Sequence, residues 1–500
     1  MGFKPLKIGK LISNIPIIQG GMGIGVSGYN LASAVANAGA IGVISAAQIG
    51  YREKDFKTNT KEANIRALRK EIRKARELSP EGILGVNIMV AMNNYEELVN
   101  VCLEEKIDII ISGAGLPLKL PSYIKDSDVK IAPIVSSKKA TTIIIKQWIK
   151  KYDKLPDLII VEGPLAGGHL GFKYDDLNNE ELNLGNILKD VLEEVRIYED
   201  KFHINIPVIA AGGIYERKDI KKFLELGASG VQIATRFIAT EECDAHINFK
   251  KALINCKEQD IKIIKSPVGL PGRAIKNAFV NKVCKARINP EFCFKCLKSC
   301  NPKETPYCIS KALIEAVKGN LEEGLIFTGS NGYRINKINH CKRFNKRANR
   351  EYIGKGRFLS ESINILNELL VDNFNDILTI EQQALQSGIF KDISVTEIHT
   401  IEAIGMYKPR NMSQVAMDLG ITVGTLTTAV NNLVKKEYVE RKRSEEDRRI
   451  VEIKLTKKGK LAYRIHDKFH SDMIRATIEG LTEEEEKVLI KSLDKLNKLF

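Results

Sequence analysis

Short apolar runs alternate with helix-like segments through the first half of the chain. Each run has the length of a buried strand, and strands that alternate with helices form parallel βα units. Eight such units can close into a (β/α)8 barrel, in which the chemistry lies at the C-terminal ends of the strands. The predicted strands are Pro16–Gln19, Ala40–Ser45, Leu84–Met89, Asp108–Gly113, Lys130–Ser136, Asp157–Gly163, Pro207–Gly213 and Gly230–Thr235.

From Phe358 onward the apolar positions follow a helical period instead. Ser394 and Glu397 have the spacing of a helix capping box. Between Asn411 and Val434, two helices are predicted to meet at Gly420 as a helix-turn-helix, in which the second helix would bury Leu426, Val430 and Leu433. The pattern predicts a mainly α domain in this half.

A basic, strand-like segment and a final helix follow the predicted helix-turn-helix. Residues 440–459 alternate at their end like a strand, which predicts a β-hairpin wing with a basic tip. The last helix is expected to present one apolar stripe, formed by Leu489, Leu493, Leu496 and Phe500. Between strands two and three, Lys61–Leu78 reads as a solvated barrel helix.

These patterns divide the chain into three parts. We expect a TIM (β/α)8 barrel over residues 1–338 with a Cys-rich segment at 284–308, a basic linker at 339–357, and a winged helix-turn-helix domain over 358–500. The α/β barrel is thus followed by a mainly α domain.

Composition and charge predict the kind of partner and the cellular compartment. A chain of 500 residues is too long for one ordinary domain, and its net charge of +15 indicates a polyanionic partner or a Lys-rich solvated surface. No apolar run is long enough to span a bilayer, and the N-terminus does not resemble a secretory signal. We therefore expect a cytoplasmic protein without membrane contact, whose nine cysteines are thiols or metal ligands rather than disulfides.

The ends of strands seven and eight predict a phosphate site. The seventh predicted strand ends in Gly212-Gly213, and the eighth ends in Gln232-Ile233-Ala234-Thr235, so backbone N–H groups and one hydroxyl would form an anion nest. A second Gly-rich turn, Gly20–Gly25, follows the first strand. No acidic residue ends the second strand to hold a ribose, which argues against a dinucleotide-binding fold.

His169 follows the sixth strand between glycines. An imidazole at the C-terminal end of a barrel strand suits a general base, although a lone histidine is also often structural. The chain also has a dense cysteine cluster, which could bind Zn²⁺ or an iron–sulfur cluster or consist of reduced thiols. Its members are Cys293, Cys296, Cys300 and Cys308.

Five motifs in this half, taken together, resemble the nitronate monooxygenase family, which includes the FMN-dependent enoyl-ACP reductase II branch. They begin at Pro16, Gly85, Ala166, Ile206 and Val231 and span roughly residues 5–335 in the family's order.

The resemblance implies a TIM barrel that binds FMN, with His169 as the catalytic histidine. It places Asn87, Glu162, Gly167, Gly213 and Gln232–Thr235 (Gln232, Ile233, Ala234 and Thr235) against the flavin, and Gln19, Gly21 and Met22 along its isoalloxazine face. Two residues depart from the family: Leu165 stands where a carboxylate is common, and Ala234 where glycine is common.

The resemblance leaves the substrate open. The first expectation is oxidative denitrification of an alkyl nitronate, with His169 as the base for a neutral nitroalkane. The alternative is NAD(P)H-dependent reduction of a trans-2-enoyl thioester, with His169 orienting or protonating the substrate. A third interpretation is a transcription regulator that uses the flavin barrel as a redox or ligand sensor.

The second half resembles the MarR family of winged-helix regulators over about residues 359–500, through the two-helix motif, Val439–Arg441, Asp447–Arg449 and Leu455–Gly459. The resemblance implies a homodimer that binds double-stranded DNA at a palindromic operator. Thr428 and Glu437 replace residues that are often Arg and Gly in the family. The residues expected at the DNA are Thr422, Val423, Gly424, Thr427 and Thr428 from the second helix, and Arg443, Arg448 and Arg449 from the wing.

Overall fold

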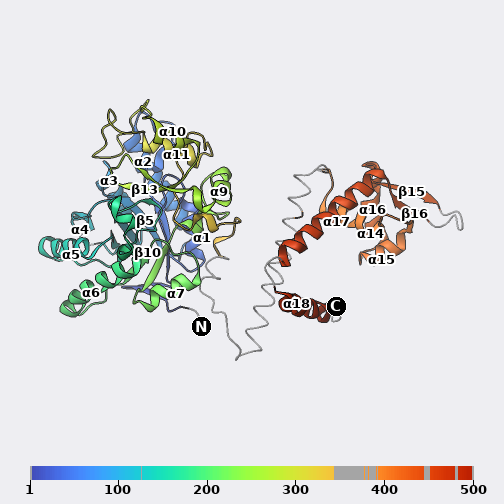
Figure 1. Ribbon diagram of the computed structural model, residues 1–500, viewed down its shortest axis with the longest axis horizontal. Helices are drawn as coiled ribbons and strands as arrows, with labels where there is room; N and C mark the ends of the chain where they lie inside the picture. Colours follow the sequence, from blue (N-terminus) through green and yellow to red (C-terminus); the bar gives the residue numbers. More distant parts are fainter. Residues whose placement is uncertain are drawn as a thin grey trace. The chain divides into compact units, whose positions relative to one another are not determined.

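The computed structural model describes residues 3–124, 127–342, 377, 381, 390, 392–443, 451–478 and 482–497. The chain forms two compact units, Met1–Tyr352 and Ile353–Phe500, each with its own hydrophobic core (Figure 1). Each unit is therefore described by itself.

A closed sheet of eight parallel strands forms the centre of the first unit. The strand order is β3-β11-β10-β8-β7-β6-β5-β4, and a parallel bridge between Ile18 and Ile41 joins the two ends into a barrel. This confirms the predicted TIM barrel and its eight strands, and excludes the open sheet of a dinucleotide-binding fold. The strands are β3 (Ile17–Gln19), β4 (Gly42–Ser45), β5 (Leu84–Met89), β6 (Ile109–Gly113), β7 (Lys130–Val135), β8 (Ile159–Glu162), β10 (Val208–Ala211) and β11 (Gly230–Ile233).

Helices follow the strands and cover the outside of the barrel (Figure 1). One of them, α2 (Thr60–Leu78), is the predicted helix between the second and third strands, and its buried face includes Leu68 and Ile72. The others are α1 (Tyr29–Asn37), α3 (Tyr95–Glu104), α4 (Leu120–Ile124), α5 (Lys138–Tyr152), α6 (Leu184–Phe202), α7 (Arg217–Glu225) and α8 (Thr235–Ile238).

Alternation along the strands separates two apolar layers. Ile111, Ile160 and Ile209 pack together inside the barrel, whereas residues such as Ile110 pack outward against the helices. The hairpin of β1 (Leu6–Ile8) and β2 (Leu11–Ser13) adds Leu6 and Ile8 to the inner cluster. Because these side chains fill the interior, the space for a ligand is left at the C-terminal ends of the strands.

A small antiparallel sheet lies beside those strand ends. It has the order β12-β13-β9, formed by β12 (Ile261–Lys265), β13 (Pro271–Ile275) and β9 (Gly168–His169), and pairs Gly272 with His169. Helices α9 (Ile247–Ile254), α10 (Ala278–Lys285) and α11 (Ile309–Val317) belong to the same region of the chain. The sheet thus brings strands as far apart in sequence as β9 and β13 together at one side of the barrel mouth.

The second unit is a winged helix-turn-helix around a core that contains Leu426, Val430 and Leu433. Its capping box is formed as predicted, since Ser394 and Glu397 each accept a backbone N–H from the other. The wing is the antiparallel pair β15–β16. The elements are α14 (Val395–Ile404), β14 (Arg410–Asn411), α15 (Met412–Asp418), α16 (Val423–Lys435), β15 (Val439–Arg443), β16 (Val451–Leu455), α17 (Lys457–Ile478) and α18 (Glu483–Asn497).

Several predicted features lie partly or wholly outside the described residues. These are the linker beyond residue 342, Asp447, Arg448 and Arg449 of the wing, the side chain of Leu496, and Phe500. Leu489 and Leu493 of the predicted apolar stripe are exposed on α18. Glu437 has a left-handed φ of +63°, which suits the glycine that the resemblance expects there.

None of the described helices is long and apolar enough to cross a membrane.

Candidate functional site

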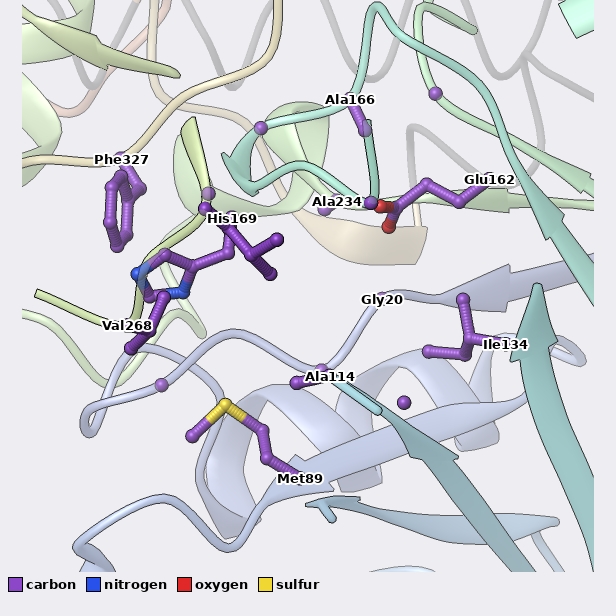
Figure 2. A pocket seen from close by; sticks show the side chains of 18 of the residues that line it. Gly20, Met89, Ala114, Ile134, Glu162, Ala166, His169, Ala234, Val268 and Phe327 are labelled. Carbon is purple, nitrogen blue, oxygen red and sulfur yellow. The ribbon is translucent and has the colours of Figure 1, made fainter. Parts of the chain in front are cut away.

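A cavity of about 1400 Å³ opens at the C-terminal ends of the barrel strands. Its wall includes the last residues of several strands, among them Ser45, Gly113, Glu162 and Ala211, as well as residues of the loops that follow. In Figure 2, side chains from the strand ends and from the adjoining small sheet face one shared space. This is the end of the barrel at which such folds place their chemistry.

One part of the wall presents unpaired backbone donors. Within the described chain, no group accepts a hydrogen bond from the backbone N–H of Gly212, Gly213, Ala234 or Thr235, and all four residues line the cavity. The four residues are partly exposed to the cavity, and a group of free backbone donors at these strand ends is able to bind an anion. We call these four residues the amide cradle.

Neighbouring contacts hold the cradle in place. The side-chain amide of Asn331 donates to the Gly213 carbonyl (2.8 Å), and the Thr235 hydroxyl oxygen accepts the Gly329 N–H (3.0 Å). A Cβ added at Gly213, whose φ is +77°, would lie 2.8 Å from the Leu165 Cβ. Only glycine therefore fits this position without strain.

His169 reaches the cavity from β9. Its Nε2 lies 2.7 Å from the Ser266 hydroxyl, and its ring meets that of Phe327 edge to face, with the centroids 5.0 Å apart (Figure 2). Burial lowers the pKa of His169 to about 4, so the imidazole is neutral near pH 7. A neutral imidazole, fixed by Ser266, is able to accept a proton from a ligand in the cavity.

A buried arginine fixes the loop between β8 and β9. The Arg273 guanidinium donates to the carbonyl oxygens of Pro164 (2.8 Å) and Ala166 (2.5 Å), and burial lowers its pKa to about 10. Because this loop contains Gly167 and leads into His169, Arg273 couples the small sheet to the position of the catalytic candidate.

Glu162, the last residue of β8, brings a carboxyl group to the cavity wall. No hydrogen-bond donor contacts this carboxyl within the described chain, and burial raises its pKa from 4.5 to about 7. Glu162 is therefore partly protonated near neutral pH, and is able to donate as well as accept a hydrogen bond there.

We expect Glu162 to make the flavin-free barrel less stable as the pH rises. Between pH 4.5 and 7 the folded chain holds a proton that the unfolded chain has lost, which costs about 3 kcal/mol above pH 7. In thermal unfolding, Glu162→Gln should therefore raise the midpoint by several degrees at pH 8 and leave it unchanged at pH 4.5. The surface variant Glu181→Gln serves as control. Equal midpoints for Glu162→Gln and the parent at pH 8 would contradict the buried, unpaired carboxyl.

The cavity brings together all but one of the residues expected at a flavin. Gln19 is the exception: it is fully buried, its amide donates to the Gly20 carbonyl, and its Oε1 accepts the Val43 N–H, so it supports the strands from outside the cavity lining. The residues that line the cavity are Gly21, Met22, Asn87, Glu162, Gly167, His169, Gly212, Gly213, Gln232, Ile233, Ala234 and Thr235.

Sequence reasoning missed the residues that come from the small sheet and its loops. Ser266, Arg273 and Asn331 lie 97 or more positions along the chain from the site residues that they contact. Phe327, which packs against the His169 ring, is equally remote in sequence. The sequence gives one hint of these residues: after β11 the alternation of strands and helices stops. That segment contains no recognisable motif.

The cysteine cluster lies beside the cavity, which Cys296 helps to line. Among the described residues, no three of the four cysteine sulfurs come within 4.8 Å of one another, so the spacing of a tetrahedral metal site is not formed. Burial raises the thiol pKa values of Cys296, Cys300 and Cys308, which favours protonated thiols. Metal binding by this cluster stays a prediction.

In the second unit, the expected DNA-reading residues gather at the start of α16. Thr422 caps the helix by accepting the Thr425 N–H (3.2 Å), and Val423, Gly424 and Thr428 are exposed. The Thr427 hydroxyl donates to the Val423 carbonyl (2.7 Å), which leaves its oxygen as an acceptor. Arg443, at the end of β15, is exposed on the wing.

Two family models match the chain. A model described as nitronate monooxygenase matches residues 4–346, and one described as MarR family matches residues 393–451. A probable nitronate monooxygenase from Staphylococcus saprophyticus is 28% identical, and the match covers 55% of this chain and 79% of that protein.

A second relative acts on a different substrate class. It is the (3aS,4S,5R,7aS)-5-hydroxy-7a-methyl-1-oxo-octahydro-1H-indene-4-carboxyl-CoA dehydrogenase of Rhodococcus jostii, which is 26% identical over 54% of this chain. The chain spans 64% of that relative's length.

Among solved structures, FabK from Thermotoga maritima matches with a TM-score of 0.53 and 27% identity, over 67% of this chain and 91% of FabK. A nitroalkane oxidase from Streptomyces ansochromogenes matches with a TM-score of 0.52 and 20% identity, over 67% of this chain and 94% of that protein, and shows the fold alone.

Proposed function

Because this chain belongs to the nitronate monooxygenase family of flavin-dependent oxidoreductases and also carries a MarR-family domain, we propose that its barrel binds FMN and reduces a trans-2-enoyl thioester with NAD(P)H. The size of the cavity is the observation that carries the choice of substrate. The residues present fit FMN, since the amide cradle offers a phosphate four donors that have no other partner within the described chain.

The cavity has more room than one drug-sized ligand fills, which leaves space beside FMN for a substrate with an acyl chain. Pockets for one drug-sized ligand measure about 300–1,000 Å³, whereas this cavity measures about 1400 Å³. Its lining away from the cradle is largely apolar, as an acyl chain requires. That part of the wall includes Met89, Met92, Leu116, Val268, Leu270, Leu313 and Phe327.

When bound, FMN carries hydride between a nicotinamide and the substrate. The amide cradle would hold its phosphate, and Asn87 and Glu162 would contact the flavin. His169, fixed by Ser266, would orient the thioester carbonyl as a neutral imidazole, and Cα would take its proton from solvent as hydride reaches Cβ. Each turnover then consumes one NAD(P)H and one proton, and yields NAD(P)⁺ and the saturated thioester.

Oxidation of an alkyl nitronate is the second candidate, and the neutral imidazole of His169 favours it. A base with a pKa of about 4 is free to take a proton from a nitroalkane at neutral pH. A regulator that uses the flavin barrel as a sensor remains the third, and turnover separates it from both enzymes.

Turnover with matched substrates tests the proposal. We expect the FMN-loaded chain to oxidise NAD(P)H with C4 and C10 2-enoyl thioesters, and to use the C10 compound with at least a tenfold higher kcat/KM, because the longer chain buries more apolar surface. Oxygen-dependent turnover of propionate-3-nitronate, without enoyl reduction, would favour the monooxygenase instead. FMN binding with neither activity would favour the sensor.

The MarR-family domain supports DNA binding. We propose that the start of α16 reads the DNA, that the wing contacts phosphates, and that the chain acts as a homodimer. Arg443 is the described member of the wing's arginines expected at the DNA.

We expect Arg443→Ala to weaken DNA binding in a salt-dependent way. Removal of one phosphate contact should lower the slope of log K against log salt by about 1, with a similar loss for different sequences. Fluorescence anisotropy at graded salt, on a duplex that the chain itself selects from a random pool, measures both effects. Arg464→Ala removes the same charge from an exposed position on α17 and is the matched control. An unchanged slope for Arg443→Ala would contradict wing contact.

A further inference from the structure

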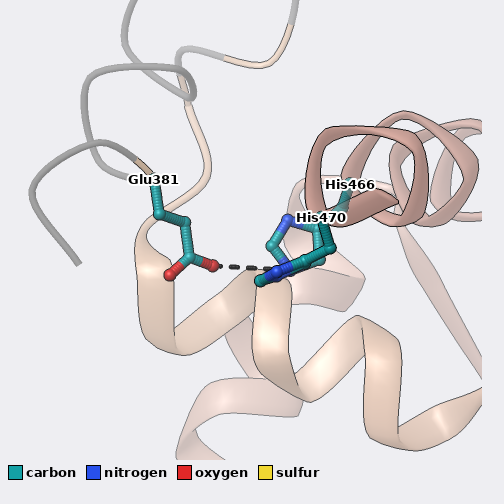
Figure 3. A group of neighbouring side chains, drawn as sticks. All are labelled: Glu381, His466 and His470. Carbon is teal, nitrogen blue, oxygen red and sulfur yellow. Dashed lines mark hydrogen bonds and ion pairs between the residues drawn. The ribbon is translucent and has the colours of Figure 1, made fainter. Parts of the chain in front are cut away.

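The second unit contains a group of histidines and carboxylates that neither the fold nor DNA reading explains. His399 lies on α14, His466 and His470 lie one turn apart on α17, and Glu381 is brought to them from an earlier part of the chain. Figure 3 shows the side chains of Glu381, His466 and His470 directed at one another. We call these four residues the His–Glu cluster.

The donor atoms of the cluster are close together. The Nε2 atoms of His466 and His470 are 3.1 Å apart, and Glu381 Oε1 lies 3.4 Å from the Nε2 of His466. The Nε2 of His399 lies 2.8 Å from the same carboxylate oxygen. The ligand atoms of Glu381, His466 and His470 all lie within 4.8 Å of one another, as do those of His399, Glu402 and His466.

The centre of the cluster is shielded from water. Glu381 is 2% exposed and His466 is 5% exposed, so their polar atoms need partners inside the protein. If the Nε2 of His466 accepts a hydrogen bond from His470, its lone pair faces the lone pairs of the carboxylate at 3.4 Å. If the Nε2 of His466 instead donates its proton to Glu381, it has neither a proton nor a lone pair left for the Nε2 of His470. Hydrogen bonds alone therefore satisfy this arrangement poorly, whereas a central cation accepts every lone pair.

We propose that Glu381, His399, His466 and His470 form a binding site for Zn²⁺ in the second unit. Three imidazole nitrogens and one carboxylate oxygen are a ligand set that suits Zn²⁺. Bonds of about 2.0–2.1 Å in a tetrahedron place neighbouring ligand atoms about 3.4 Å apart. The separations of 3.1 and 3.4 Å among Glu381, His466 and His470 lie near that edge length. His399 is hydrogen-bonded to Glu381 at 2.8 Å and is not within 4.8 Å of all three, so it would turn toward the ion to become the fourth ligand.

The site would fasten two helices that matter for the domain's geometry. His399 comes from α14, which packs against both α16 and α17. Ligation by His399, His466 and His470 would thus tie α17 to α14, which packs against α16, the helix expected at the DNA. Glu402, half-exposed and 3.7 Å from His466, stands at the edge of the site, where an ion would enter.

Equilibrium dialysis of the full chain against graded ZnCl₂, followed by elemental analysis, tests the site. We expect the parent to bind one equivalent of zinc, and His470→Gln and Glu381→Gln to bind it at least about 100-fold more weakly. Loss of a ligand should lower the affinity at least as much as loss of an outer-shell partner, which lowers it by up to about 100-fold. Asp472→Asn removes an exposed carboxylate from the same helix and should bind zinc like the parent. A parallel variant in which Cys293 and Cys300 are changed to Ser shows whether thiols hold the zinc. This variant should still bind one equivalent.

Thermal unfolding keeps the test independent of folding defects. Zinc at about 100 times its Kd should stabilise the parent and Asp472→Asn by about 2.7 kcal/mol, whereas the two ligand variants should gain no more than about 0.4 kcal/mol. Zinc uptake that is equal in the parent and in the histidine, glutamate and aspartate variants, uptake that disappears only in the cysteine variant, or no uptake by the parent would each overturn the proposal.

Discussion

Gly213→Val should yield a folded protein that no longer retains FMN. Valine at a φ of +77° is strained by roughly 1–2 kcal/mol or more, and its Cβ would lie 2.8 Å from that of Leu165. The loop must move to relieve both, which displaces the N–H groups of Gly212 and Gly213 from the phosphate. Flavin absorbance per chain after gel filtration, together with circular dichroism, measures the effect.

Gly9→Val is the matched control for this variant. Gly9 also has a positive φ, of +58°, but it lies in the β1–β2 hairpin, and an added Cβ there meets only the flexible end of Lys130 at 3.4 Å. We expect this variant to lose some stability and keep its flavin. If Gly213→Val held FMN as tightly as Gly9→Val does, the amide cradle would not be the phosphate site.

His169→Gln should retain FMN and lose turnover by about 10²–10³-fold, the usual cost of removing a group that stabilises the charge developing on a carbonyl oxygen. The flavin should stay because the four donors of the cradle are backbone groups of other residues. Anaerobic mixing with NAD(P)H and an enoyl thioester separates reduction of the bound flavin from reduction of the substrate. Only the second step should slow.

The pH profile gives a second readout for the same residue. With a pKa of about 4, His169 stays neutral from about pH 6 to 9, so its ionisation should leave no inflection in that range. An inflection near pH 7 would belong to Glu162 and should vanish in Glu162→Gln. An inflection near 6.5, the ordinary pKa of histidine, that persists in Glu162→Gln and disappears in His169→Gln would show that the imidazole is not buried as described.

The barrel could be predicted because its strands are buried on both faces. Runs such as Ile109–Gly113 are apolar almost throughout, and strands of that kind alternating with helices have few other solutions. The position of the amide cradle could be predicted as well, since barrels of this kind place phosphate sites on the loops after strands seven and eight. Its use for a phosphate stays a prediction.

The residues and strands that hold the site in place could not be predicted from local sequence patterns. Strand β9 has two residues, and its partner β13 lies about a hundred positions further along the chain, so no local period marks the pair. Gln19 was placed at the flavin by motif position, yet its side chain turns into the wall to accept the Val43 N–H. The His–Glu cluster was missed for the same reason, because Glu381, His399 and His466 are spread over three separate segments.

The most direct test of the central claim compares FMN with riboflavin, which lacks only the phosphate. Titrated into the flavin-free chain, FMN should bind at least about 100-fold more tightly, because two or more N–H bonds to a charged oxygen contribute about 1.5–3 kcal/mol each. Equal affinities for the two flavins would show that the four unpaired amides at the barrel mouth hold no phosphate, and would contradict the account.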